Sequence, residues 1–204
     1  MKYTAIGFDY GGVIEGRPSQ FFNEMVCRTL DISLTEYELT YFRHNREHNN
    51  GKLISQNELW QRFVVDVGKP ELLSTLLVAI EDYKSELTVN TDVLELITRL
   101  KNNGYKLGLL SNNSVSVGKR LRVDGIDKYF DSFVVSAEIG MMKPDKNIFD
   151  YFCSELAVEP NQLIYIDDSE KSLSTAPQCG YTPILFSTYT NLIQQLQALG
   201  VDTH

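Results

Sequence analysis

The sequence predicts an α/β fold in which a doubly wound, Rossmann-like parallel sheet carries an inserted all-helical cap. One apolar strand stands alone near the N-terminus, about seventy residues of helical patterning follow it, and short apolar runs then alternate with helical segments. Short strands separated by helices of this length are typical of parallel βαβ units. We therefore expect an α/β core domain at residues 1–15 and 88–204 and a helical cap domain at 16–87.

The first expected strand covers residues 3–8 and ends abruptly at Asp9. The helical block after it divides at Asn49-Asn50-Gly51 and at Gly68-Lys69-Pro70, because glycine and proline end helices. Its expected helices span 19–31, 34–47, 55–67 and 70–84. A block of this kind interrupts an α/β unit after its first strand, so it predicts a separate cap.

From residue 91 onward helices and strands are expected to alternate. The expected helices cover residues 91–103, 115–123, 146–157, 170–179 and 190–199. The expected strands between them cover residues 106–110, 132–135, 163–166 and 182–185. The last residues, 201–204, follow the final helix and are expected to fray.

The composition argues against several classes of binding partner and location. A formal net charge of -8 opposes binding to nucleic acid or to an anionic membrane surface. The three cysteines are widely spaced and form no CxxC pair, which favours a reduced, cytoplasmic location. No apolar run approaches the roughly 18 residues of a membrane span, and no signal peptide is expected. Monomer and homodimer both stay open.

Polar residues follow four of the expected strands at the points where those strands end. In open parallel sheets, ligands bind outside the carboxyl ends of the strands, near the point where strand order reverses. We therefore expect these side chains to share one site: Asp9, Ser111, Asn112, Lys143, Asp167 and Asp168.

Three of these side chains are carboxylates, Asp9, Asp167 and Asp168. Two bare carboxylates about 4 Å apart repel by roughly 4 kcal/mol at an effective dielectric constant near 20, so a cation should lie between them. A set of carboxylate, carbonyl and water oxygens suits Mg²⁺, which also shares its site with substrate phosphate. The sequence therefore predicts a magnesium site.

Four short motifs occur in order at these strand ends, with the helical block between the first and the second. They are Asp9-Tyr10-Gly11-Gly12-Val13, Leu110-Ser111-Asn112, Gly140-Met141-Met142-Lys143-Pro144-Asp145 and Ile166-Asp167-Asp168. Together they resemble the haloacid dehalogenase (HAD) superfamily, whose members are mostly phosphatases, and the insertion resembles that family's helical cap of the first type.

The resemblance implies a magnesium-dependent phosphatase of a small phosphorylated metabolite. Asp9 would attack phosphorus in line and form an aspartyl phosphate, which water hydrolyses. Ser111 and the backbone amides of Asn112 and Gly12 would bind phosphate, and Lys143 would neutralise charge. The carbonyl of Gly11 would join the aspartates as a metal ligand; Asp168 would bind the metal directly while Asp167 orients it, or the reverse.

Gly11 departs from the family pattern, which usually has an aspartate there to protonate the leaving group and activate water. Such acid and base assistance contributes typically about 10²- to 10⁴-fold in rate. Three explanations stay open: a leaving group that needs little protonation, a replacement acid, or a site that binds phosphate and turns over poorly. The first favours a sugar 1-phosphate, whose hemiacetal oxygen is comparatively acidic.

The chain also resembles a branch that contains a hexose 1-phosphate phosphatase, which is similar in its glycine at this position and in a cap segment comparable to Asn50-Gly51-Lys52-Leu53-Ile54-Ser55. Candidate replacement acids are Glu15, His44 and His48, although a solvated helix face is the favoured interpretation of the two histidines. Arg17 and Arg43 are interpreted as surface charges. Ser172 stands where relatives often have Asn or Asp.

Two other function classes remain. A noncatalytic or weakly active phosphate-binding regulator could use the same scaffold. A 2-haloacid dehalogenase resembles this chain in its nucleophile, serine, lysine and cap, but it typically has an aromatic residue at the Gly11 position and needs no metal. The adjacent carboxylates Asp167 and Asp168 favour a metal and therefore a phosphatase.

Overall fold

The computed structural model describes residues 2–16, 19–49 and 55–204 and contains one five-stranded parallel sheet. The strands are β1 Ala5–Phe8, β2 Lys106–Ser111, β3 Ser132–Val135, β4 Leu163–Asp167 and β5 Thr182–Leu185. Their order is β3-β2-β1-β4-β5, and all pairs are parallel. The chain therefore winds outward in both directions from β1, which confirms the predicted doubly wound sheet.

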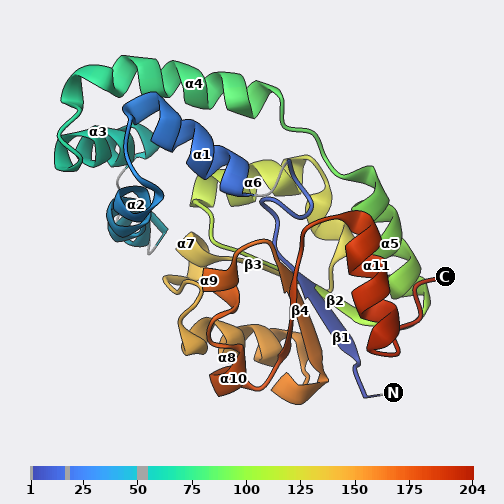
Figure 1. The fold of residues 1–204 in the computed structure, drawn as a ribbon. Coiled ribbons are helices and arrows are strands. Elements are labelled where there is room, and N and C mark those ends of the chain that lie inside the picture. The colour runs from blue at the N-terminus through green and yellow to red at the C-terminus, as the bar shows by residue number, and fades with distance from the viewer. Residues whose placement is uncertain (1, 17–18, 50–54) are drawn as a thin grey trace.

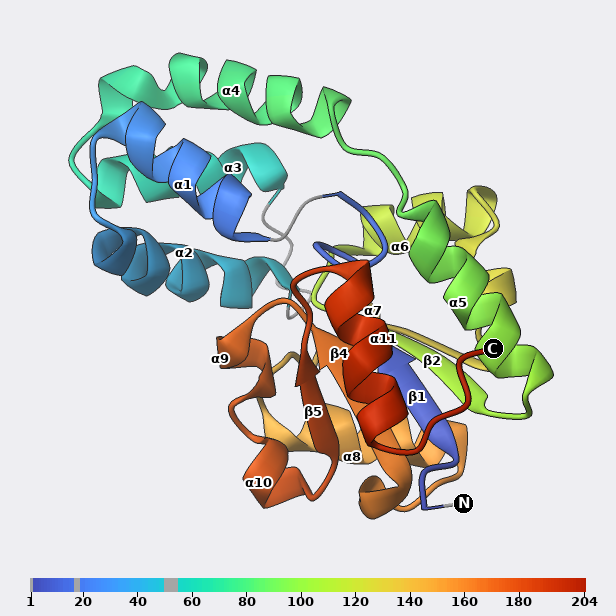
Figure 2. The same cartoon turned by 45° about the vertical axis from the view of Figure 1, so that its right-hand side comes forward.

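Helices cover both faces of the sheet, so the core has three layers (Figure 1). On one face, α5 Thr91–Asn102, α6 Val115–Val123 and α11 Tyr189–Ala198 share an apolar cluster with the strands. On the other, α8 Lys146–Leu156, α9 Glu170–Leu173 and α10 Ala176–Cys179 do the same. Figure 2 shows α5 and α11 in front of the sheet and α8 behind it.

Two glycines set the distance between α8 and the sheet. Gly7 of β1 and Gly108 of β2 are register partners, and the ring of Phe152 in α8 lies against both. A Cβ atom at Gly7 would lie 2.7 Å from Phe152 Cε1, and one at Gly108 would lie 2.4 Å from Phe152 Cζ. Glycine at both positions therefore lets an aromatic ring contact the backbone of the two central strands.

The cap consists of α1 Ser19–Leu30, α2 Leu34–Asn49, α3 Gln56–Asp66 and α4 Leu73–Ser85, the last preceded by a 3-10 turn at Pro70–Leu72. These four helices have a hydrophobic cluster of their own. At its centre Trp60 stacks on Tyr41 and meets Phe63 edge to face. The four predicted cap helices are confirmed, while the exact domain boundaries stay a prediction.

The cap is connected to the core by two chain segments that are hydrogen-bonded to each other. Gly16 N–H donates to Thr88 O at 2.9 Å, and Asn90 N–H donates to Ile14 O at 2.8 Å. The segment that leaves the core after β1 therefore runs beside the segment that returns to α5, as Figure 1 also shows.

The predicted single helix at 170–179 is wrong. The structure has α9 at Glu170–Leu173 and α10 at Ala176–Cys179 instead. Pro177 lies in the first turn of α10, where its missing N–H is tolerated, whereas a continuous helix would have placed it in the interior. A short helix at Ser136–Ile139, α7, was also not predicted, because four residues carry too little periodicity.

The prediction that residues 201–204 fray is wrong as well. Val201 and Thr203 are each 4% exposed. Two side chains of the α5 region bind this segment: Arg99 Nε donates to Thr203 O at 3.1 Å, and Asn103 Nδ2 donates to Asp202 O at 3.1 Å. Donors distant in sequence therefore fix a terminus that has no regular structure of its own.

The described cysteines, Cys27, Cys153 and Cys179, are free thiols. Within residues 2–16, 19–49 and 55–204, no helix combines the length and the apolar character that crossing a membrane demands.

We expect Gly108→Ala to lower the free energy of unfolding by about 1–3 kcal/mol, because the added methyl group overpacks the contact with Phe152. Urea unfolding followed by circular dichroism measures the change. Gly11→Ala is the matched control, since a Cβ at Gly11 would have no atom within 4 Å. An equal loss in both variants would contradict this account of the contact.

Candidate active site

The side chains predicted to share a site all line one cavity of about 610 Å³ between the core and the cap. Asp9 follows β1, Ser111 ends β2, and Asp167 ends β4. The loop between α7 and α8 contributes Lys143. The residues singled out from the sequence that line the cavity are Asp9, Gly11, Gly12, Glu15, Ser111, Asn112, Lys143, Asp167, Asp168 and Ser172.

The Lys143 ammonium lies at the centre of this arrangement and is almost completely buried. Its Nζ atom lies 2.6 Å from Asp167 Oδ2, 3.0 Å from Asp9 Oδ1 and 2.8 Å from the Tyr165 hydroxyl. Burial lowers the pKa of Lys143, but the charges of Asp167 and Asp9 outweigh it and raise that pKa above its usual value. Lys143 is therefore a buried cation that faces three oxygen atoms.

Asp167 is fully buried, and both of its carboxylate oxygens already accept hydrogen bonds. Oδ1 accepts from the Ser169 N–H at 2.9 Å, and Oδ2 accepts from Lys143. Burial raises the pKa of Asp167, and the Lys143 ammonium opposes that rise. Both oxygens of Asp167 are therefore already engaged within the buried wall of the cavity.

Asp168 is the more accessible of the two adjacent carboxylates. Its Oδ2 accepts a hydrogen bond from the Ser19 N–H at the start of α1, so a cap helix contacts the acidic group directly. Burial and the charge of Asp9 raise the pKa of Asp168. Gly12, at φ +72°, lies against this carboxylate, since a Cβ there would be 2.4 Å from Asp168 Oδ2. A side chain at position 12 would displace Asp168.

The three carboxylates fit a divalent cation. Asp9, Asp167 and Asp168 each offer an oxygen, and these atoms lie within 4.8 Å of one another. Asp9 Oδ1 is buried, yet its contact with Lys143 lacks the geometry of a hydrogen bond, so this oxygen keeps an acceptor site. A set of converging oxygens with uncompensated negative charge suits a hard cation such as Mg²⁺.

The polar groups after β2 have distinct roles. Asn112 holds the Lys143 loop: its Nδ2 donates to Lys143 O, and Lys143 N–H donates to its Oδ1, both at 2.9 Å. The side chain of Asn112 is therefore occupied, and only its backbone amide could meet a phosphate. The Ser111 hydroxyl accepts from Asn113 Nδ2 at 3.0 Å, which leaves its own proton for another acceptor.

The two glycines of the first motif differ. Gly12 N–H donates to Glu15 O at 2.8 Å. This amide would therefore have to share its hydrogen with Glu15 O, or give up that bond, to donate to a phosphate. Gly11 lines the cavity, and an added Cβ there would meet no atom within 4 Å. Position 11 has room for an aspartate, so crowding does not explain its absence.

The candidate replacement acids fall in different places. Glu15 lines the cavity, but its Oε1 accepts from the Tyr10 hydroxyl at 2.9 Å and pairs with Arg120 at 3.0 Å. The favoured solvated-face interpretation of His44 is wrong: His44 is 8% exposed, and its Nε2 lies 2.9 Å from Asp66 Oδ2. His44 lies outside the described cavity lining, because α3 packs against its face of α2.

The other residues singled out from the sequence are Arg43, Arg17, His48 and the cap segment 50–55. Arg43 is an exposed side chain that pairs with Asp66 at 3.1 Å, as a surface charge would. Arg17 and most of the cap segment 50–55 lie outside the described residues, as does the side chain of His48.

Sequence reasoning missed Tyr165. This residue of β4 is fully buried, and its hydroxyl donates to Leu110 O at 2.6 Å while it accepts from Lys143. The available signal was a tyrosine in an otherwise aliphatic buried strand, since a buried phenol needs a hydrogen-bond partner. Tyr165 therefore connects β2 and β4 and supplies one of the oxygens around the ammonium.

Comparisons with known proteins agree on one family. The model of the family described as haloacid dehalogenase-like hydrolase matches residues 23–186. The glyceraldehyde 3-phosphate phosphatase of Methanopyrus kandleri is 30% identical over 119 residues, which cover 57% of this chain and 51% of that protein. The (S)-2-haloacid dehalogenase 4A of Burkholderia cepacia is 27% identical over 107 residues, which cover 52% of this chain and 46% of that protein.

The chain thus spans about half the length of these two curated relatives. Among solved structures, a HAD family enzyme of Bacteroides thetaiotaomicron, determined as a magnesium complex, superposes with a TM-score of 0.65. That match covers 95% of this chain and 100% of the other at 20% identity, so it shows the shared fold.

We expect Tyr165→Phe to lower the free energy of unfolding by about 1–3 kcal/mol, because it leaves Leu110 O without its donor and Lys143 with one acceptor fewer. Chemical denaturation measures the loss. Tyr181→Phe is the matched control, since the Tyr181 hydroxyl packs in the same aromatic group but has no hydrogen bond of normal geometry among the described residues. The interpretation fails if both variants lose the same stability.

Proposed function

This chain belongs to the haloacid dehalogenase-like hydrolases, and from that premise we propose that it is a magnesium-dependent phosphatase of a small phosphorylated metabolite. The observation that carries the proposal is the placement of Asp9 in a cavity, 3.0 Å from the Lys143 ammonium and within 4.8 Å of a carboxylate oxygen of Asp168. A carboxylate in this setting combines a nucleophile with nearby positive charge and a cation site.

We propose that one oxygen of Asp9 attacks phosphorus while the bond from phosphorus to the leaving oxygen breaks. The leaving oxygen departs with the bonding electron pair and takes a proton from water. A second water then attacks phosphorus in the aspartyl phosphate, which releases inorganic phosphate and restores the Asp9 carboxylate. Lys143 offsets negative charge beside Asp9, and the Ser111 hydroxyl donates to a phosphate oxygen.

The proposed metal ligands are Asp9, the carbonyl of Gly11 and Asp168, with Asp167 as their support. The occupied oxygens of Asp167 and the greater accessibility of Asp168 favour this division. When bound, Mg²⁺ would supply positive charge that lowers the repulsion between Asp9 and a phosphate dianion. The structural relative determined as a magnesium complex supports the choice of cation.

The leaving group is proposed to depart with little help from an acid. Gly11 offers no proton, and Glu15 already accepts from Tyr10 and pairs with Arg120. A leaving oxygen of low basicity compensates for this absence, which favours sugar 1-phosphates over ordinary alkyl phosphates. Acyl and aryl phosphates share the advantage.

The likeness to a haloacid dehalogenase gives a second candidate. In that reaction Asp9 would displace a halide from carbon, and no metal is needed. The cluster of Asp9, Asp167 and Asp168 disfavours this candidate, because in a metal-free mechanism the single Lys143 ammonium would have to offset three carboxylates.

We expect Mg²⁺-dependent phosphate release from at least one group among sugar 1-phosphates, aryl phosphates and acyl phosphates, with loss of activity in EDTA. Asp9→Asn should reduce kcat by about 10³-fold or more, as loss of a nucleophile does. Asp150→Asn, at an exposed residue paired with Lys146, is the control and should retain activity.

Two outcomes would overturn the phosphatase assignment. Metal-independent halide release from 2-chloropropionate, abolished by Asp9→Asn, would identify a dehalogenase. An absence of metal-dependent phosphate release from every substrate class, together with phosphate binding that Asp9→Asn does not weaken, would identify a noncatalytic regulator.

We expect Gly11→Asp to increase kcat by at least about 10-fold on alkyl phosphates and much less on aryl phosphates, because the new acid assists a basic leaving oxygen most. The open space around position 11 allows the substitution. The dependence of kcat on leaving-group pKa measures the effect, and Gly11→Asn controls for size. A uniform change across leaving groups would refute the idea.

A further inference from the structure

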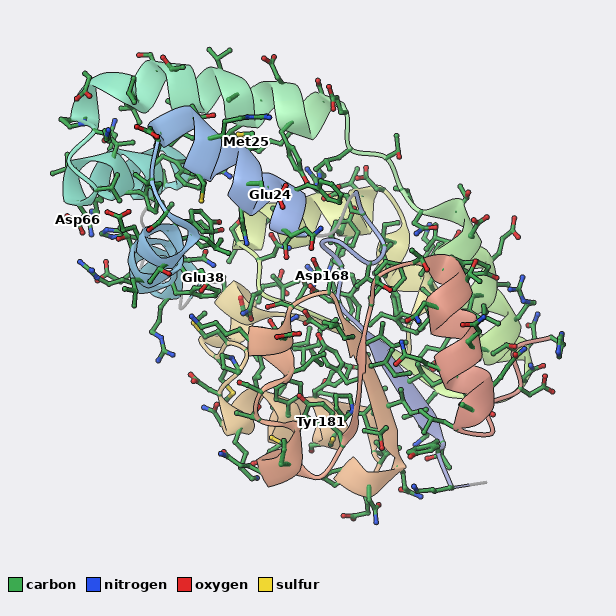
Figure 3. The ribbon with its side chains drawn as sticks, viewed as in Figure 1. Glu24, Met25, Glu38, Asp66, Asp168 and Tyr181 are labelled. Atoms are coloured by element: carbon green, nitrogen blue, oxygen red, sulfur yellow. The ribbon has the colours of Figure 1, made fainter. Side chains whose placement is uncertain are left out.

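We infer that the cap half of the cavity selects leaving groups that bear hydrogen-bond donors and no negative charge, and that Glu24 and Glu38 impose this selection. The inference rests on the proposed phosphatase function and concerns the substrate class. Glu24 lies on α1 and Glu38 on α2, and both line the cavity that also contains Asp9. Figure 3 shows both on the part of the cap that faces the core, opposite Asp168.

The described lining of the cavity is rich in acids and poor in cations. Besides the three aspartates it contains four glutamates: Glu15, Glu24, Glu38 and Glu170. Its only described ammonium groups are those of Lys143 and Lys171. Lys143 is already enclosed by Asp9 and Asp167, so among the described residues of the lining Lys171 is the ammonium left to meet an anionic group at the cap end.

Lys171 is itself engaged with the cap. Its Nζ atom lies 3.2 Å from the centroid of the Phe42 ring on α2, an arrangement typical of a cation–π interaction. Burial lowers the pKa of Lys171, the charge of Glu38 partly counters this, and the charge of Arg46 on α2 lowers the pKa further. The Phe42 ring and the charge of Glu38 therefore already stabilise the Lys171 ammonium, which leaves less of its positive charge for an anionic ligand.

Glu24 and Glu38 keep their acceptor capacity. Among residues 2–16, 19–49 and 55–204, neither carboxylate has a hydrogen bond or a close ion pair. Ionised carboxylates only accept hydrogen bonds, so their ligands must donate.

The substrate class that fits is a neutral or aminated sugar phosphate. Sugar hydroxyls and a sugar ammonium both donate to carboxylates, whereas a carboxylate or a second phosphate on the leaving group would meet like charge. Like-charge juxtaposition at a binding surface excludes wrong partners effectively. Uronic acids, phosphorylated hydroxy acids and bisphosphates should therefore be poor substrates.

Three substrates that differ away from the reacting phosphate test the selection: glucose 1-phosphate, glucosamine 1-phosphate and glucuronic acid 1-phosphate. The wild-type chain with Mg²⁺ should show a kcat/KM for the uronic acid at least about 10-fold below that for glucose 1-phosphate. The double variant Glu24→Gln, Glu38→Gln should lower the ratio of kcat/KM for glucose 1-phosphate to kcat/KM for glucuronic acid 1-phosphate severalfold, since glutamine keeps the shape and removes the charge. Glu81→Gln, at an exposed cap residue outside the lining, is the control and should keep the wild-type ratio.

The outcomes separate this inference from the proposed function. Preference for glucosamine 1-phosphate would identify an ammonium as the selected donor, and equal use of both nonacidic sugars would identify the hydroxyls. Equal use of the uronic acid by the wild type, or a ratio that the double variant leaves unchanged, would overturn the inference. Magnesium-dependent release from an aryl phosphate but from none of the sugars would overturn the sugar class, and release from no phosphate ester would overturn the proposed function itself.

Discussion

The site depends on the buried ammonium of Lys143. An ammonium group removed from water is stable only where carboxylates and hydrogen-bond acceptors replace its hydration, and Asp167, Asp9 and Tyr165 do so. The dependence is mutual, because the carboxylates would repel one another far more strongly without the ammonium. Asp9 follows β1, whereas Asp167 and Tyr165 both lie on β4, so the ammonium connects β1, β4 and the loop before α8.

The local backbone conformation serves this cluster. The backbone of Gly12 has a positive φ, and because Gly12 has no side chain, the Asp168 carboxylate can lie against it. Asn112 closes the arrangement by pairing with both backbone polar groups of Lys143. The cap contributes as well, since the first N–H of α1 binds Asp168, and the start of a helix favours a negative charge. The position of the cap is therefore linked to the acid cluster.

How well the sequence predicts a feature depends on how far apart in the chain the interacting residues lie. The strands, most helices and the strand-end residues were predictable, because apolar runs, glycines and parallel topology are local or general properties. The role of Tyr165, the pairing of His44 with Asp66 and the docking of residues 201–204 depend on partners distant in sequence. The break within 170–179 is an intermediate case, because Pro177 was visible but its position within a helix was not.

Gly11 and the cap carboxylates constrain the same step of the proposed reaction. Without an acid at position 11, the leaving oxygen carries negative charge until it acquires a proton from water. Glu24 and Glu38 lie in the same cavity and destabilise the negative charge on the leaving oxygen, since nearby negative charge raises the pKa of the departing alcohol. A leaving group of low basicity reduces the first difficulty, and hydroxyl or ammonium donors that bind these carboxylates reduce the second. A sugar 1-phosphate meets both requirements, because its anomeric oxygen is a comparatively good leaving group and its ring supplies the donors.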